Sequence, residues 1–170
     1  MKKKHKDTDI FSDAPPKKEK LWRRGFFVPL LGWFPRMPRE KSVYGILLAA
    51  AAADGNMHRL ELAEIHVLAE RIRSLRNVPR AKLNKMQEQI RPHLETKKHA
   101  AFTDLATRSL RTAKKDQRAS VFMHALDILF ADRMLTDSEK SFIRQLGHQL
   151  YLSDEDVGAY ADVMATKNLH

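Results

Sequence analysis

The 170-residue chain contains no cysteine. Disulfides, thiolate metal sites and cysteine nucleophiles are therefore excluded. Glycine and proline are scarce as well, with six and seven residues, and only one proline lies after residue 80. The long middle and C-terminal part of the chain is thus nearly free of helix breakers, which favours helices.

Several motifs of catalysis are also missing. The sequence has no Gly-Lys-Ser/Thr phosphate loop, no dinucleotide fingerprint and no His-Glu-x-x-His zinc helix. The Glu-x-x-His tetrapeptide of di-iron helix bundles is absent too. We therefore expect a protein without enzymatic activity, and the sequence identifies no small-molecule substrate.

A membrane-spanning run is lacking. A spanning helix needs ~20 apolar residues, whereas the apolar stretch 21–35 is interrupted by Arg, Gly and Pro. It also lacks the long apolar core and the cleavage site of a secretory signal. We expect a cytoplasmic protein. Any contact with the inner membrane is expected to be peripheral.

Residues 1–40 are predicted to form a basic, aromatic N-terminal arm. Residues 1–20 are rich in lysine and have no apolar periodicity, which predicts disorder. The next part combines aromatic with basic side chains, a composition typical of contact with anionic membrane surfaces. The predicted contacts are Trp22, Arg23, Arg24, Phe26, Phe27 and Trp33. Alternatively, the arm folds back and covers a groove on the helical domain.

Charge is unevenly distributed along the chain. Residues 71–118 hold 14 Lys/Arg against 4 Asp/Glu, a net +10, and residues 1–41 hold 12 against 5, a net +7. Residues 42–70 and 119–170 carry −3 and −4. The basic stretch 71–118 indicates either a nucleic-acid-binding module or a solvated helix surface that balances the acidic parts.

The 3.6-residue spacing of apolar positions predicts an all-α fold over residues 41–167. The expected helices span about 40–53, 58–75, 79–91, 96–112, 115–131, 137–151 and 154–165. Pro92 is expected to stop or kink the third helix, and Ser153 to cap the seventh. His124 and Asp127, one helical turn apart, are expected to form an i,i+3 hydrogen bond. Seven helices joined by short turns make a compact bundle.

An acidic motif occurs twice at an offset of 78 residues. Ala53-Asp54-Gly55 with Glu61 reappears as Ala131-Asp132-Arg133 with Glu139, and the flanking apolar positions align in the same register. Each copy follows one apolar run and precedes an amphipathic one. The repeat predicts two related helix-turn-helix halves.

Two interpretations of the repeated acids stay open. As turn and capping residues, Asp54 and Asp132 end one helix and Glu139 caps the next, with Thr136 as its capping-box partner. As ligands, Asp54, Glu61, Asp132 and Glu139 meet and hold a calcium or magnesium ion, because both ions prefer carboxylate oxygens. The absence of thiolates and clustered imidazoles disfavours zinc.

The sequence resembles the tellurite-resistance TerB-like family over about residues 42–165. The resemblance rests on Ala-Asp-Gly followed by Glu at the start of a helix, and on the second copy, LFADRMLTDSEKSFIRQLGHQLYLSDEDV. The sequence is also similar to the related N-terminal domain of membrane-anchored DnaJ-like co-chaperones.

The resemblance implies a fold of about seven helices in two related halves, without enzymatic activity, and metal-binding acids at Asp54, Glu61, Asp132 and Glu139. Arg133 stands where the family commonly has Gly, which places a cation beside Asp132. The implied role is that of an accessory protein in stress or tellurite resistance. Its expected partners are other stress-resistance proteins or the inner-membrane surface, with nucleic acid as the alternative.

Overall fold

A computed structural model describes residues 37–55, 57, 59–95, 98–131 and 135–167, with the backbone alone at 59–61. These residues belong to one compact unit, Arg36–His170. The predicted membrane contacts Trp22, Arg23, Arg24, Phe26, Phe27 and Trp33 lie outside the described residues. The division of the chain into an arm at 1–40 and a helical domain at 41–167 therefore stays a prediction.

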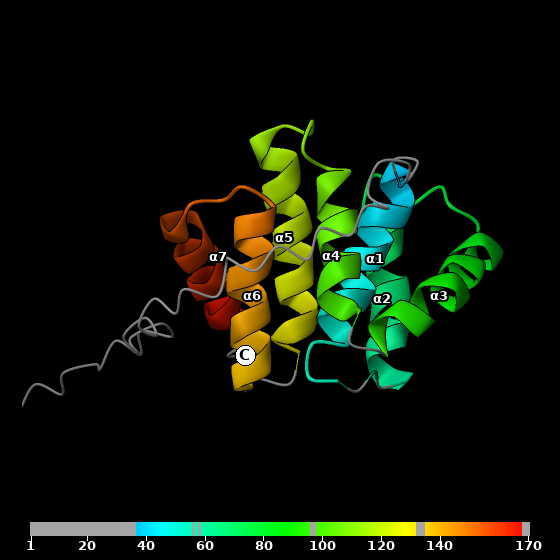
Figure 1. Cartoon of the computed structure of the whole chain (residues 1–170), viewed down its shortest axis with the longest axis horizontal. Coiled ribbons are helices and arrows are strands. Elements are labelled where there is room, and N and C mark those ends of the chain that lie inside the picture. The colour runs from blue at the N-terminus through cyan, green and yellow to red at the C-terminus, as the bar shows by residue number, and fades with distance from the viewer. Residues whose placement is uncertain (1–36, 56, 58, 96–97, 132–134, 168–170) are drawn as a thin grey trace, which may run out of the picture. The chain divides into compact units, whose positions relative to one another are not determined.

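Seven α-helices and no strand are present in the described part of the chain, which confirms the predicted all-α fold (Figure 1). They are α1 (Arg39–Ala51), α2 (Arg59–Arg71), α3 (Arg80–Leu94), α4 (His99–Arg108), α5 (Lys115–Leu129), α6 (Asp137–Gln149) and α7 (Asp154–Lys167). None of these seven helices has both the length and the apolar character needed to cross a bilayer.

Helix α1 lies in the middle of the domain because its sequence is apolar on every side. Every residue from 42 to 51 is buried, and α1 packs against α2, α3, α4 and α5 (Figure 1). Gly45 permits the close approach of α4, since a Cβ there would lie 2.7 Å from Cζ of Phe102. The first apolar run of the repeat is thus the core of the fold.

The bounds of the helices show the same repeat as the sequence. Helices α1 and α5 end at Ala51 and Leu129, and α2 and α6 run over 59–71 and 137–149, all at the offset of 78. The hydrogen bonds that close α1 recur in α5. Ala52 N donates to Leu48 O at 3.1 Å, and Phe130 N donates to Leu126 O at 2.9 Å. The two helix pairs therefore share the same local geometry at these ends.

Two helix ends differ from the expectation. Pro92 was expected to stop or kink α3; the helix continues through Pro92 to Leu94, so the stop is wrong and the expected end at residue 91 is three residues short. Proline removes a single donor so close to the helix end, and the extra turn buries Leu94. Helix α2 ends at Arg71 rather than 75, and tight turns follow in which Leu75 N donates to Ile72 O at 2.8 Å.

The predicted capping residues of the last two helices are confirmed. Thr136 caps α6 through a full capping box with Glu139. At the start of α7, Ser153 Oγ donates to Asp156 Oδ2 at 2.7 Å, and Asp156 N donates to Ser153 Oγ at 3.1 Å. Hydrogen bonds from Lys115 and from Ser153 lower the pKa of Asp156 to about 2. The carboxylate therefore keeps its charge at any ordinary pH.

Candidate cation site at the acidic turns

The helix ends that precede the two acidic motifs lie at the same end of the domain. Helices α1 and α5 run side by side in the same direction, and each turn follows the C-terminal end of one of them (Figure 1). The C-terminal end of a helix carries partial negative charge from its unpaired carbonyl groups. Both helices therefore add to the negative potential that the acids create at this end.

The four predicted ligands are described to different extents. Asp54 is exposed in the turn after α1, beside Gly55, whose φ of 94° is in the left-handed region that glycine favours. Glu139 is half-buried at the start of α6. Asp132 and the side chain of Glu61 lie outside the described residues. The assembly of all four acids consequently stays a prediction.

Glu139 has a clear structural role. Its Oε2 accepts hydrogen bonds from Thr136 N at 2.7 Å and from Thr136 Oγ1 at 2.8 Å, while Thr136 Oγ1 accepts one from Glu139 N at 3.2 Å. These bonds to the carboxylate all fall on Oε2. Within the part of the chain that the structure describes, its other oxygen, Oε1, accepts no hydrogen bond and can face water or a cation.

A shallow groove of about 470 Å³ joins the two acidic motifs. Ala53 of the first motif lines it together with Asp137 and Ser138 of the second. The turn after α1 and the start of α6 therefore face one space, although 84 positions separate Ala53 and Asp137 in the sequence.

His99 links α4 to α1 and α6 beside this groove. The sequence did not indicate this role. Its Nε2 lies 2.9 Å from the carbonyl oxygen of Ala49, near the end of α1. Its ring also packs on Phe142 of α6, with the ring centroids 5.5 Å apart. Because these partners lie 50 and 43 positions away, no local pattern could have indicated the role of His99.

The described side chains alone do not form a metal centre. Within that part of the chain, no three His, Asp or Glu side chains come together as a metal ion would require. A cation at the acidic turns would therefore depend on Asp132 and Glu61 in addition to Asp54 and Glu139.

The expected hydrogen bond between His124 and Asp127 is wrong. Their closest approach, from His124 Nδ1 to Asp127 Oδ2, is 4.0 Å, which is too long for a hydrogen bond. Asp127 pairs instead with Lys167 of α7. Burial lowers the pKa of His124 below its usual value, so the imidazole is neutral at physiological pH.

The basic stretch 71–118 is partly neutralised within the domain. Arg91 pairs with Glu95, Arg108 with Asp104, and Lys115 with Asp156. Lys82 pairs with Glu40 of α1 at 3.3 Å. The pairs with Glu40 and Asp156 use carboxylates from outside the stretch, so the charge that the stretch presents to phosphates is smaller than its own net +10, which weakens the nucleic-acid alternative.

Fold and turns together define an all-helical domain of two related helix pairs with acidic turns at one end. Residues 40–162 match the family described as Tellurite resistance protein TerB, and the chain belongs to this family. Membership suggests a role related to tellurite resistance. Comparisons with curated proteins and with solved structures gave no match.

Proposed function

We propose that this protein is a non-enzymatic accessory protein of tellurite or stress resistance that binds a divalent cation at its acidic turns. The ligands would be Asp54, Glu61, Asp132 and Glu139, and the ion calcium or magnesium. It would act through association with other resistance proteins or with a membrane surface.

The proposal rests on the groove that residues of both acidic motifs line. Ala53 of the first acidic motif and Asp137 and Ser138 of the second line the same space, which supports an approach of the two acidic motifs to one ion. The parallel C-terminal ends of α1 and α5 favour positive charge at this place. Carboxylates held together without a cation would repel each other, and a bound ion removes that repulsion.

Calorimetry of the full chain with calcium, magnesium and zinc tests the cation. We expect heat with calcium or magnesium, and a rise in melting temperature that grows with ion concentration, because the ion binds the native state. The double variant Asp54→Asn with Asp132→Asn should lose both signals. If the wild type gives neither heat nor a thermal shift, the acids are turn and capping residues only.

The variant Glu139→Gln separates the two roles of this side chain. Glutamine serves at this position of a capping box, so the free energy of unfolding without the ion should change by less than about 0.5 kcal/mol. The lost charge should nevertheless weaken cation binding. Glu155→Gln, in the first turn of α7, removes a charge elsewhere and should leave the affinity unchanged. Equal affinity of Glu139→Gln and wild type would contradict ligation by Glu139.

The second part of the proposal concerns the arm. Residues 1–40 would attach the protein to anionic bilayers through Trp22, Arg23, Arg24, Phe26, Phe27 and Trp33. Each basic residue near such a surface contributes about 1 kcal/mol, an attraction that salt screens.

Sedimentation with anionic vesicles tests the arm in the full chain. We expect salt-sensitive binding that falls when Arg23→Gln and Arg24→Gln are combined. The matched control combines Arg91→Gln with Arg108→Gln, which removes the same charge from α3 and α4. An equal loss in both double variants would mean that net charge, and not the arm, drives association. Low binding by the wild type and both double variants would favour an arm that folds back.

A further inference from the structure

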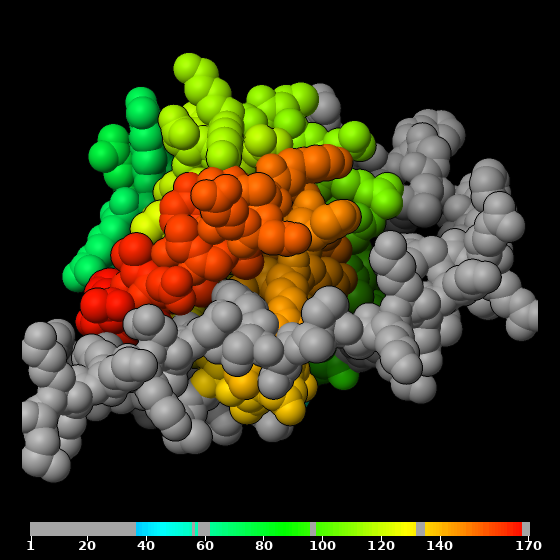
Figure 2. Space-filling model, turned by 90° about the vertical axis from the view of Figure 1, so that its left-hand side faces the viewer, coloured from blue at the N-terminus to red at the C-terminus, as the bar shows by residue number. Residues whose placement is uncertain are grey.

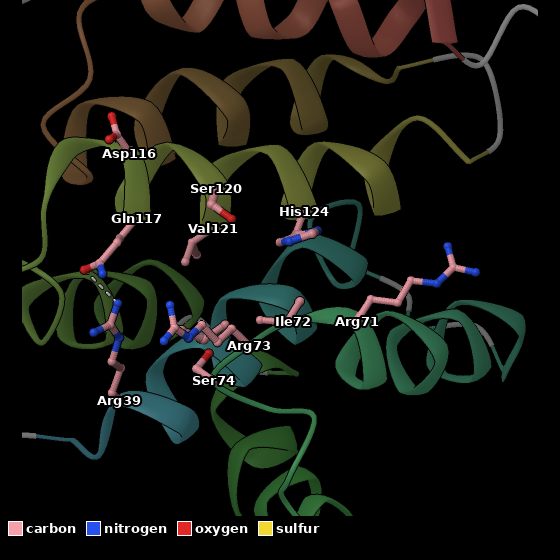
Figure 3. Close-up of a pocket in the computed structure, with 11 residues that line it drawn as sticks. Arg39, Arg71, Ile72, Arg73, Ser74, Asp116, Gln117, Ser120, Val121 and His124 are labelled. Atoms are coloured by element: carbon pink, nitrogen blue, oxygen red, sulfur yellow. Dashed lines mark hydrogen bonds between the residues drawn. The ribbon is translucent and has the colours of Figure 1, made fainter.

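A second groove lies at the opposite end of the central helices from the acidic turns. It has a volume of about 750 Å³ and is formed by the start of α1, the segment after α2 and the start of α5 (Figure 3). Arg39, Arg73, Gln117 and Ser120 are among the polar residues that line it. We call it the arginine groove.

The arginine groove lies where the two repeats face each other. Arg39 and Gln117 are equivalent positions of the repeat, 78 residues apart, and Arg39 Nη2 donates to Gln117 Oε1 at 2.9 Å. Val43 and Val121 are also equivalent, and both line the groove. Gln117 thus holds the guanidinium of Arg39 in place at the contact between α1 and α5.

The groove is positively charged. Arg39 and Arg73 point into the same space from two different segments (Figure 3). Neither forms an ion pair with any carboxylate in the part of the chain that the structure describes, unlike Arg91 or Arg108. Two cations that line one groove repel each other unless an anion lies between them.

Other groups favour an anion as well. The groove lies at the N-terminal ends of α1 and α5, where the helix dipoles are positive. Ser74 and Ser120 add hydroxyl donors. Asp116 is the one carboxylate among the lining residues, and its side chain points away from Arg39 and Arg73, as does that of Arg71 (Figure 3).

The groove is lined by apolar residues as well. Val43, Ile72 and Val121 are buried residues that line it, and its volume is in the range of small-molecule sites, about 300–1,000 Å³. A free inorganic oxoanion would fill only a small part of this space. His124 lines the groove near Ile72 (Figure 3).

We infer that the arginine groove binds a small organic phosphate. The phosphate lies between Arg39 and Arg73, whose planar guanidinium groups match its oxygens. The organic part lies over Val43, Ile72 and Val121 and meets the imidazole of His124. The site is separate from the acidic turns and does not depend on cation binding there.

Calorimetric titration of the full chain with three probes tests this inference. The probes are adenosine monophosphate, adenosine and inorganic phosphate. We expect adenosine monophosphate to bind more tightly than either fragment. Arg39→Gln and Arg73→Gln should each weaken its binding about tenfold or more, the loss typical of a charge-assisted hydrogen bond. Both residues are exposed, so both variants should keep the wild-type melting temperature.

Two further variants locate the site. Arg108→Gln removes one charge from α4, outside the groove, and should bind the nucleotide like the wild type. Ser120→Leu places a bulky side chain at an exposed lining position and should abolish binding without unfolding the protein. The inference is overturned if Arg108→Gln loses as much affinity as Arg73→Gln, or if Ser120→Leu still binds. It is overturned also if adenosine monophosphate binds no better than inorganic phosphate.

Discussion

Replacing Leu48 or Leu126 with alanine is expected to lower the free energy of unfolding by about 2–5 kcal/mol in each case. The two leucines are equivalent positions of the repeat, one turn before the ends of α1 and α5. Both have an exposed fraction of 0%. Each substitution removes buried methyl groups and leaves a cavity in a close-packed interior, and both effects cost stability.

Urea unfolding followed by circular dichroism measures this loss. The urea concentration at the unfolding midpoint should fall. The dependence of the unfolding free energy on urea concentration should stay constant, because the substitution changes stability and not the surface exposed on unfolding. Val67→Ala is the control, because Val67 on α2 is 53% exposed and its loss should cost less than about 0.5 kcal/mol. If only one of the leucine variants is destabilised, the two repeats do not contribute equally to the core.

Much of the fold could be predicted because its signals are local. The apolar runs before Asp54 and Asp132 predicted α1 and α5, and Thr136 with Glu139 predicted the start of α6. The offset of 78 residues fixed which helices correspond. These features depend on residues within one or two turns of each other, and a sequence displays such relations directly.

Helix ends were less predictable where two conformations satisfy the same apolar spacing. Ile72 and Leu75 continue the pattern of α2, yet the chain buries both through tight turns after Arg71. Pro92 normally marks a helix boundary, but close to the end of α3 it removes a single hydrogen bond. Tertiary packing decided both cases, and packing is not visible in a window of sequence.

The two candidate sites also differed in how far the sequence could predict them. The acids at the turns were visible because the motif repeats, whereas the distances between them depend on tertiary structure. The arginine groove was missed because Arg39, Arg73 and Gln117 come from three separate segments. Its one possible sequence signal was the offset of 78 between Arg39 and Gln117, which the alignment of the acidic motifs already contained.

The repeat gives the domain two ends of opposite character. The parallel helices α1 and α5 begin at the arginine groove and end at the acidic turns. Both helices have their positive ends at the arginine groove and their negative ends where the acidic motifs begin in the sequence. An anion and a cation would therefore bind at opposite ends of the same helix pair.

Replacing Gly147 with alanine is expected to destabilise the domain by about 1–3 kcal/mol, although alanine favours helices. Gly147 lies in α6, which packs against α7 (Figure 2). An added Cβ would overlap Cγ2 of Val157 and touch Cε2 of Phe122 at 3.7 Å. Val157 cannot turn away cheaply, because branched side chains in helices strongly prefer one rotamer. The two helices would have to separate.

A double-mutant cycle with Val157→Ala tests this close packing. Val157→Ala removes the overlapping methyl group, so the double variant should be more stable than the sum of the two single effects implies. The coupling energy should be about 0.5–3 kcal/mol. Gly158→Ala is the matched control, since a Cβ at this neighbouring position on α7 meets nothing within 4 Å. It should raise stability by about 0.4–1 kcal/mol. A coupling energy near zero would mean that the loss at Gly147 comes from somewhere other than the contact between α6 and α7.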